Sequence, residues 1–234
     1  FLPGDDLEDR ILPVPMAHDL GALIGRMDVA LAGLSSVGHA HAHVPPPHDL
    51  THFAETRRRL SQCCRHARDG RQPMNIGAAI PWPLVDRCLD DLEARARSWG
   101  SLPRQLIHGD LSAQNLLADG ARVTGVLDFG DVAVGARVAD IAVAICHLGF
   151  AQGRAHTRII RALWDGWSNV VSPTATECRV LPALMTSRFC KLIVDHAWRE
   201  LHAPPRPGHG ALINAGVQGL HALMETPRQE VAAL

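Results

Sequence analysis

The stretch from His108 to Asp131, HGDLSAQNLLADGARVTGVLDFGD, holds polar side chains whose types and spacing could do chemistry together. Asp110 and Asn115 flank a short loop, and Asp128 and Asp131 follow an apolar run. An amide oxygen and a carboxylate form a hard-oxygen ligand set that suits Mg²⁺, which typically takes one or two protein ligands. A further carboxylate held off the metal could accept a proton from an attacking hydroxyl group.

Short strands must bring these side chains together. Residues 105–107 and 116–118 read as strands, and residues 123–127 form a hairpin with the second strand across an Asp-Gly turn. Asn115 opens one strand of the hairpin and Asp128 follows the other, so adjacent strand ends place both side chains close together. The loop that carries Asp110 lies beside them, and the pattern favours Mg²⁺-dependent phosphoryl transfer.

The alternative is that these residues only make turns, because Asp and Asn favour turns for local hydrogen-bonding reasons. Either half of the pattern alone fits that explanation. The two halves occur in this order, Asn115 and Asp128 are thirteen positions apart, and a hairpin joins them. The combination favours a catalytic site.

Apolar residues at helical spacing predict helices on both sides of this β insert. The predicted helices span residues 16–34, 51–67, 83–99, 137–150, 154–169, 174–202 and 209–225. A His- and Pro-rich loop, residues 36–49, and a second loop, residues 70–82, interrupt them. The expected fold class is mainly α with a small β-hairpin insert (α+β).

Composition bounds the class of protein. The chain has 234 residues, 47% of them hydrophobic, and a formal net charge of -1. This balance gives no electrostatic case for nucleic acid or membrane-surface binding. No apolar run is long enough to span a bilayer. Six cysteines without a C-x-x-C pair indicate reduced thiols, which predicts a cytoplasmic protein.

The motif H-G-D-x-x-x-x-N, followed by a hairpin and D-F-G-D, resembles the aminoglycoside phosphotransferase/choline kinase-like superfamily, distant kin of protein kinases. The longer stretch LIHGDLSAQNLL and the later MTSRFCKLIVDHAW are similar to the hydroxylysine kinase-like branch. The resemblance implies that residues 1–234 form a protein-kinase-like C-terminal lobe. It also implies ATP or GTP and Mg²⁺ as cofactors.

The resemblance assigns the central roles residue by residue. Asp110 becomes the catalytic base or the group that orients the acceptor hydroxyl, and Asn115 and Asp128 become the Mg²⁺ ligands. Residues 1–4 resemble the hinge that meets adenine. The positions implied for nucleotide contact are Phe1, Leu2, Gln114, Leu117 and Leu127.

Three further residues receive supporting roles from the same resemblance. His108 would brace the loop. Asp140 resembles the helix aspartate that anchors the catalytic-loop backbone, although an ordinary carboxylate on a helix face is the alternative. Asp131 follows the D-F-G triplet and would either support the metal ligands or contact the substrate.

Members of this superfamily place an N-terminal lobe before the hinge, with a phosphate-covering loop and a lysine. This sequence starts at the hinge, has no G-x-G-x-x-G motif, and holds its single lysine, Lys191, far along the chain. We therefore expect weak or no kinase activity from the 234 residues alone. The uncovered face would associate with an N-lobe polypeptide or with itself. A catalytically dead pseudokinase or interaction module is the alternative.

The acceptor is expected to be a small amino-alcohol or hydroxy-amino acid, with an aminoglycoside as the alternative. Arg188, Asp195 and Trp198 fall at helical spacing, and could meet a carboxylate, an ammonium group and an alkyl stem. Ordinary helix packing explains the same spacing. The five histidines between His39 and His52 suit adventitious metal binding or none.

Overall fold

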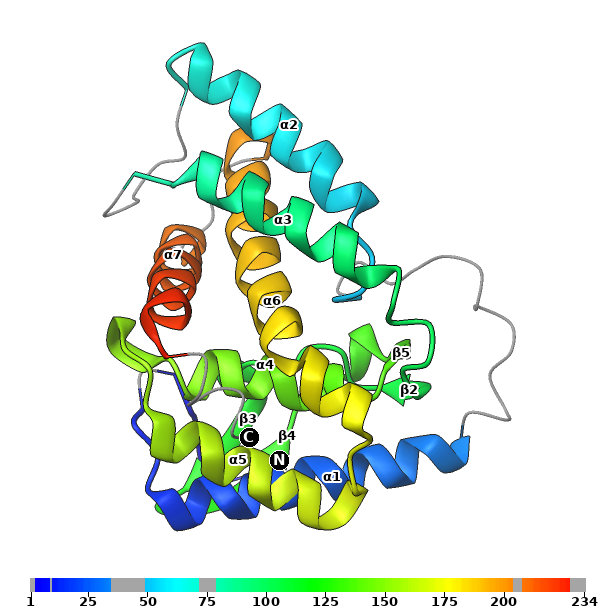
Figure 1. Ribbon diagram of the computed structural model, residues 1–234. Coiled ribbons are helices and arrows are strands. Elements are labelled where there is room, and N and C mark those ends of the chain that lie inside the picture. Colours follow the sequence, from blue (N-terminus) through cyan, green and yellow to red (C-terminus); the bar gives the residue numbers. More distant parts are fainter. Residues whose placement is uncertain (1–2, 9, 35–48, 72–78, 204–207, 228–234) are drawn as a thin grey trace.

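The computed structural model describes residues 3–8, 10–34, 49–71, 79–203 and 208–227. In these residues, helices surround two small sheets, as Figure 1 shows. The α-helices are α1 (Val14–Leu34), α2 (Ala54–Arg68), α3 (Trp82–Ala96), α4 (Val138–Leu148), α5 (Thr157–Val171), α6 (Ala175–His202) and α7 (His209–Glu225). The strands are β1 (Asp5–Asp6), β2 (Arg104–Ile107), β3 (Leu116–Asp119), β4 (Arg122–Val126) and β5 (Ala133–Ala136). The predicted fold class is confirmed.

Two antiparallel sheets carry the polar stretch. The hairpin of β3 and β4 pairs Leu116 with Val126, and β1 adds a third strand beside β3. The second sheet joins β2 to β5, with Ile107 opposite Ala133. The sequence pattern does not predict β5, because the short run AVGA becomes a strand only through its distant partner β2.

The predicted helices agree with the structure to within three residues at each end. One local prediction is wrong in detail. Asn115 closes a 3₁₀ turn, η2 (Ala113–Asn115), and the strand opens one residue later. A two-residue strand, Asp5–Asp6, follows Gly4, whereas Phe1 and Leu2 of the predicted hinge and residues 36–48 of the predicted His-rich loop lie outside the described residues.

Helices α1 and α5 pack along each other at the bottom of Figure 1, and α4 lies between them and α6. Two glycines permit the close approach of α1 and α5. A Cβ atom on Gly21 would collide with the carbonyl group of Leu163, and one on Gly166 with the carbonyl group of His18. Helix α4 is buried along nearly its whole length, so its position is fixed by packing on several sides.

The start of α6 is tied to the start of α4 by one buried carboxylate. Thr174 and Glu177 form a reciprocal capping box at the first turn of α6. The same Glu177 side chain accepts hydrogen bonds from Arg137 at 3.0 and 2.8 Å. Because α4 and α6 both contribute to the site, this pairing sets their relative position.

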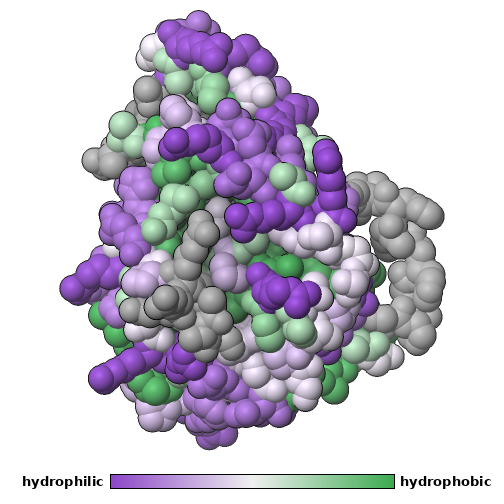
Figure 2. Space-filling model, in the orientation of Figure 1, coloured by the Kyte–Doolittle hydropathy of each residue, from purple (hydrophilic) through white to green (hydrophobic). Residues whose placement is uncertain are grey.

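Helices α2 and α3 cover the C-terminal half of α6, at the top of Figure 1. Arg57 of α2 forms ion pairs with Asp86, Asp90 and Glu93 of α3. Figure 2 shows hydrophilic side chains gathered over this end of the molecule. None of the helices in the described ranges combines the length and apolar character needed to cross a bilayer.

Candidate active site

The loop of residues 108–112 lies between β2 and η2, and Asp140 of α4 holds its backbone. Asp140 is completely buried. Its carboxylate accepts hydrogen bonds from the backbone N–H groups of His108 at 2.7 Å and Gly109 at 2.8 Å. Gly109 has a φ of 84°, and a Cβ atom there would lie 3.0 Å from the backbone oxygen of Asp131. Glycine therefore permits the turn that Asp140 anchors.

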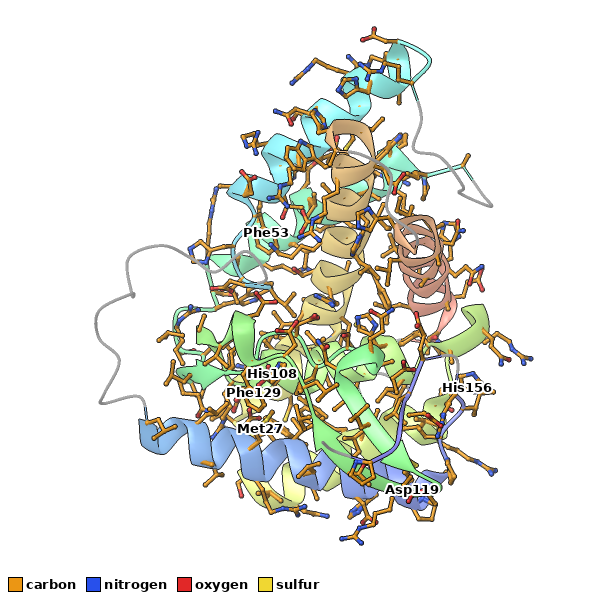
Figure 3. All side chains as sticks on the ribbon, turned by 180° about the vertical axis from the view of Figure 1, so that it is seen from behind. Met27, Phe53, His108, Asp119, Phe129 and His156 are labelled. Atoms are coloured by element: carbon orange, nitrogen blue, oxygen red, sulfur yellow. The ribbon has the colours of Figure 1, made fainter. Side chains whose placement is uncertain are left out.

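The buried ring of His108 braces the loop from the inside. Its Nε2 lies 2.9 Å from the carbonyl oxygen of Leu127, and the backbone N–H of Asp110 donates to its Nδ1 at 3.3 Å. Both contacts fit one neutral tautomer with hydrogen on Nε2. The ring of Phe129 meets His108 edge-on at 4.8 Å, and Figure 3 shows the two residues together beside the sheets. His108 thus joins the loop to the end of β4.

The Asp110 carboxylate lies between a cation and an amide. Arg188 of α6 donates from Nη2 to Asp110 Oδ1 at 2.6 Å. The side-chain amide of Asn115 donates to Asp110 Oδ2 at 3.2 Å and to the Asp110 carbonyl oxygen at 2.9 Å. The Arg188 side chain is 7% exposed and that of Asp110 is 22% exposed, so the ion pair is largely shielded from water. The carboxylate is held in a fixed orientation.

Asn115 and Asp128 lie at the same end of the hairpin. The backbone N–H of Leu127 donates to the carbonyl oxygen of Asn115 at 2.8 Å, which brings the next residue, Asp128, alongside. Asp128 has a left-handed φ of 58°, and its Oδ1 accepts from the N–H of Gly130 at 3.2 Å. The amide nitrogen of Asn115 donates to Asp110, so its amide oxygen faces away from Asp110. This amide oxygen and the exposed carboxylate fit Mg²⁺.

A cavity of about 660 Å³ opens in front of these groups. Asp110, Asp128 and Asp131 line it, together with Arg188 and Lys191 of α6. Its volume falls within the range of small-molecule sites. The cavity therefore brings the predicted base and one predicted metal ligand into the same space as cationic side chains.

Two histidines at this cavity are held neutral. His147 Nε2 lies 2.9 Å from Arg188 Nη2 and accepts its hydrogen bond. Burial, with the nearby charge of Arg188, lowers the pKa of His147 to about 3. Burial, with the charge of Arg199, also lowers the pKa of His196 to about 3. Arg188 is thus clamped between a neutral imidazole and the Asp110 carboxylate.

Replacing His147 with glutamine should make the protein more resistant to acid. The folded-state pKa of His147 is depressed, so the unfolded chain takes up a proton as the pH falls below the ordinary value of 6.5 and stability is lost. Wild type should therefore lose about 2 kcal/mol more than the variant between about pH 7 and pH 5. Denaturant unfolding of both proteins at both pH values measures this difference. An identical pH dependence of the two proteins would contradict the conclusion that His147 is neutral in the folded state.

The residues predicted to contact nucleotide are only partly brought together. The side chain of Gln114 donates to Glu8 at 2.7 Å, and both residues line the cavity. Leu117 is half-buried in β3, and Leu127 is 36% exposed. Phe1 and Leu2 lie outside the described residues. These nucleotide contacts stay predictions.

The three predicted acceptor residues do not act as one group. Arg188 and Asp195 line the cavity, but Arg59 of α2 donates to Asp195 at 2.8 Å. Trp198 is not among the residues that line the cavity. Its indole nitrogen donates to Gln62, and its ring packs 4.9 Å from the Arg59 guanidinium. A helix rises 1.5 Å per residue, so Trp198 lies about 15 Å along α6 from Arg188.

Sequence reasoning missed two residues that the fold brings to the site. His147 carries no motif, and only its burial beside Arg188 reveals it. Lys191 lies too far along the sequence to match the lysine of an N-terminal lobe, and the structure places it on the cavity wall. Its Nζ donates to the His52 carbonyl oxygen at 2.7 Å and to Thr56 Oγ1 at 3.1 Å, and burial lowers its pKa. The uniqueness of this lysine was the available signal.

The helical fold, with an anchored acidic loop and a hairpin beside it, belongs to the kinase-like class of folds. A family model described as the phosphotransferase enzyme family (APH) matches residues 1–177. The chain belongs to this family of small-molecule kinases, and the predicted superfamily is confirmed.

Individual relatives support the same family. A homoserine kinase of Zymomonas mobilis is 28% identical over 167 residues, which cover 67% of this chain and 50% of the relative. A hydroxylysine kinase of Mus musculus is 30% identical over 100 residues, which cover 39% and 26%. An ethanolamine kinase of Plasmodium vivax matches in fold with a TM-score of 0.61 at 13% identity, over 97% of this chain and 63% of that one. The chain spans about half the length of the homoserine kinase it matches.

Proposed function

We propose that this chain contributes to transfer of the γ-phosphoryl group of ATP or GTP to the hydroxyl group of a small acceptor. One observation carries the proposal. Asp110 is fixed at the wall of a cavity of about 660 Å³, and the oxygen donors of Asn115 and Asp128 lie beside it. A base, a hard-oxygen pair and space for an acceptor are the parts that phosphoryl transfer requires.

The proposed roles follow from the contacts. Asp110 accepts or orients the proton of the acceptor hydroxyl, since its carboxylate is held by Arg188 and Asn115. Asn115 and Asp128 would hold Mg²⁺, which when bound neutralises charge on the phosphates. His108 and Asp140 keep the loop in place from below. Asp131 lines the cavity near these groups.

On the nucleotide side, we infer contacts from Gln114, Leu117 and Leu127. Lys191, the single lysine, lines the same cavity, and the His52 carbonyl oxygen and Thr56 Oγ1 accept hydrogen bonds from its Nζ. The 234 residues are therefore proposed to supply the metal-binding and acceptor parts of the site. Exposed Leu127 and Phe129 border this region, and association with further polypeptide through them stays a prediction.

The acceptor is proposed to be a hydroxy-amino acid. Two relatives are named homoserine kinase and hydroxylysine kinase, and both names describe acceptors with a carboxylate and an amine. Arg188 uses Nε and Nη2 on His147 and Asp110. Among the described residues, none accepts a hydrogen bond from Arg188 Nη1. Since Arg188 lines the cavity, this nitrogen can donate to the carboxylate of the acceptor.

A panel of acceptors tests this proposal. Mg²⁺-dependent ADP release is measured with homoserine, hydroxylysine, ethanolamine and an aminoglycoside. The hydroxy-amino acids should give the highest kcat/KM. A preference for ethanolamine or the aminoglycoside would contradict the proposed acceptor class while leaving the phosphotransferase chemistry standing.

Replacing Arg188 with methionine should separate these acceptors further. Losing a charge-assisted hydrogen bond should raise KM for a hydroxy-amino acid by about 10- to 100-fold. KM for ethanolamine, which has no carboxylate, should change little. Initial rates with both acceptors measure the effect, and kcat reports separately on the disturbed Asp110. Equal changes in KM for both acceptors would exclude carboxylate binding by Arg188.

A catalytically silent binding module is the second candidate, and the Arg188–Asp110 ion pair favours it. At 2.6 Å from the Arg188 guanidinium, the Asp110 carboxylate is engaged by a cation of the protein, which competes with an acceptor hydroxyl for that oxygen. Calorimetry distinguishes the two candidates, because a silent module binds Mg²⁺·ATP and acceptor without releasing ADP.

A further inference from the structure

Two aspartates meet in the core beneath the catalytic loop. Asp28 of α1 and Asp140 of α4 are both completely buried, and their carboxyl groups lie close enough to influence each other's ionisation. Two ionised carboxylates in such contact would repel each other strongly in a poorly screening interior. The pair must therefore hold a proton at neutral pH.

Hydrogen-bond donors account for three of the four carboxyl oxygens. Trp167 Nε1 donates to Asp28 Oδ2 at 2.7 Å. The backbone N–H groups of His108 and Gly109 occupy the two oxygens of Asp140. Asp28 Oδ1 is buried and meets no N–H donor among the described residues. A proton on this oxygen would turn an orphaned acceptor into a donor, and Asp140 would be its acceptor.

The surroundings decide which residue carries the proton. Burial raises the pKa of Asp140, but the two backbone N–H groups that donate to it oppose this shift because they stabilise its charged form. Burial, with the neighbouring charge of Asp140, raises the pKa of Asp28 well above its usual range. Arg137 and His108 are the charged or titratable groups that act on the pair from neighbouring segments, and α5 contributes the neutral Trp167.

We propose that Asp28 is a neutral positioning residue whose Oδ1–H donates to Asp140 and thereby fixes the catalytic loop. The contacts run from Trp167 through Asp28 and Asp140 to the backbone of residues 108–109, next to Asp110. A further hydrogen bond supports this series of contacts, because Gln105 Nε2 of β2 donates to the Asp28 carbonyl oxygen at 2.6 Å. Helix α1, remote in sequence from the loop, thus determines where the base lies.

Asparagine substitutions should affect the two positions in opposite ways. In Asp28→Asn, an amide oxygen can accept from Trp167 while the amide nitrogen donates to Asp140, so the loop should stay ordered. In Asp140→Asn, an amide cannot accept both backbone N–H groups, so the loop should loosen. Asp28→Leu, which cannot donate, should resemble Asp140→Asn. The exposed Asp19→Asn on the same helix is the matched control.

Hydrogen exchange of the His108 and Gly109 amides is the first readout. Exchange should accelerate by at least about tenfold in Asp28→Leu and Asp140→Asn, and stay near wild type in Asp28→Asn and Asp19→Asn. If Asp28→Asn accelerates exchange as much as Asp28→Leu does, the proton-donating role is excluded. Because these amides lie in the catalytic loop beside Asp110, their exchange reports local opening of the loop more than the stability of the whole fold.

The carboxyl carbon of Asp28 gives a second readout in the unmodified protein. In ¹³C-labelled protein it should keep the chemical shift of a protonated acid across the neutral range. A carboxyl group that titrates at the ordinary Asp value would overturn the proposal. Neither measurement needs turnover. The inference rests on the proposed function only in assuming that the loop of residues 108–112 is catalytic. Absence of turnover in wild type would leave both results interpretable.

Discussion

Replacing Asp110 with asparagine should slow phosphoryl transfer by about 10²- to 10⁴-fold, the range expected for loss of a general base. Asparagine keeps the shape of the side chain and an oxygen for Asn115, but it cannot accept the acceptor proton. Mg²⁺·ATP binding should change little, because the metal oxygens belong to Asn115 and Asp128. Steady-state ADP release and calorimetry of the same preparations measure the two effects separately.

The control for this substitution is Asp119→Asn. Asp119 carries the same charge on the neighbouring hairpin, but it lies exposed at the turn, away from the site (Figure 3). Its variant should match wild type in both measurements. An Asp110→Asn protein with wild-type turnover would remove the base from the mechanism, and loss of nucleotide binding would mean that Asp110 acts on the metal.

Replacing Asp128 with asparagine should weaken Mg²⁺·ATP binding more than about 100-fold, beyond the cost of losing an outer-shell partner of a metal. Asparagine tolerates the left-handed backbone at this position and can still accept from Gly130, so the substitution chiefly removes the charge. Calorimetric titration with ATP, with and without Mg²⁺, measures the loss. Binding of ATP without Mg²⁺ should differ little between variant and wild type.

Asp131→Asn serves as the comparison for this second prediction. Asp131 lines the same cavity and carries the same charge three residues later. If a nearby negative charge were enough, both variants would lose binding equally. A large effect confined to Asp128→Asn identifies direct ligation.

Local patterns predicted what local interactions determine. Helix periodicity and the Asp-Gly turn predicted the helices and the hairpin, and the motif predicted that Asp110, Asn115 and Asp128 lie near one another. These features depend on neighbours in the sequence. The fold class followed because the helical spacing is strong and the β insert is short.

Long-range contacts could not be predicted in this way. Strand β5 forms because it pairs with β2, and the local sequence AVGA does not predict that pairing. The spacing of Arg188, Asp195 and Trp198 suggested one acceptor face, but helix α2 covers its far end through Arg59 and Gln62. Arg188 alone reaches Asp110, and the periodicity of α6 does not contain that information.

The buried pairing of α1 with α5 has a consequence for how the chain is made. At a synthesis rate of roughly 5–20 residues per second, α5 leaves the ribosome on the order of ten seconds after α1. Until then, the face of α1 that α5 will bury is exposed to water. A hydrated aspartate is ionised near neutral pH. If Asp28 is neutral in the finished fold, docking of α1 onto α5 takes up a proton, so the final assembly step should be faster in mildly acidic medium.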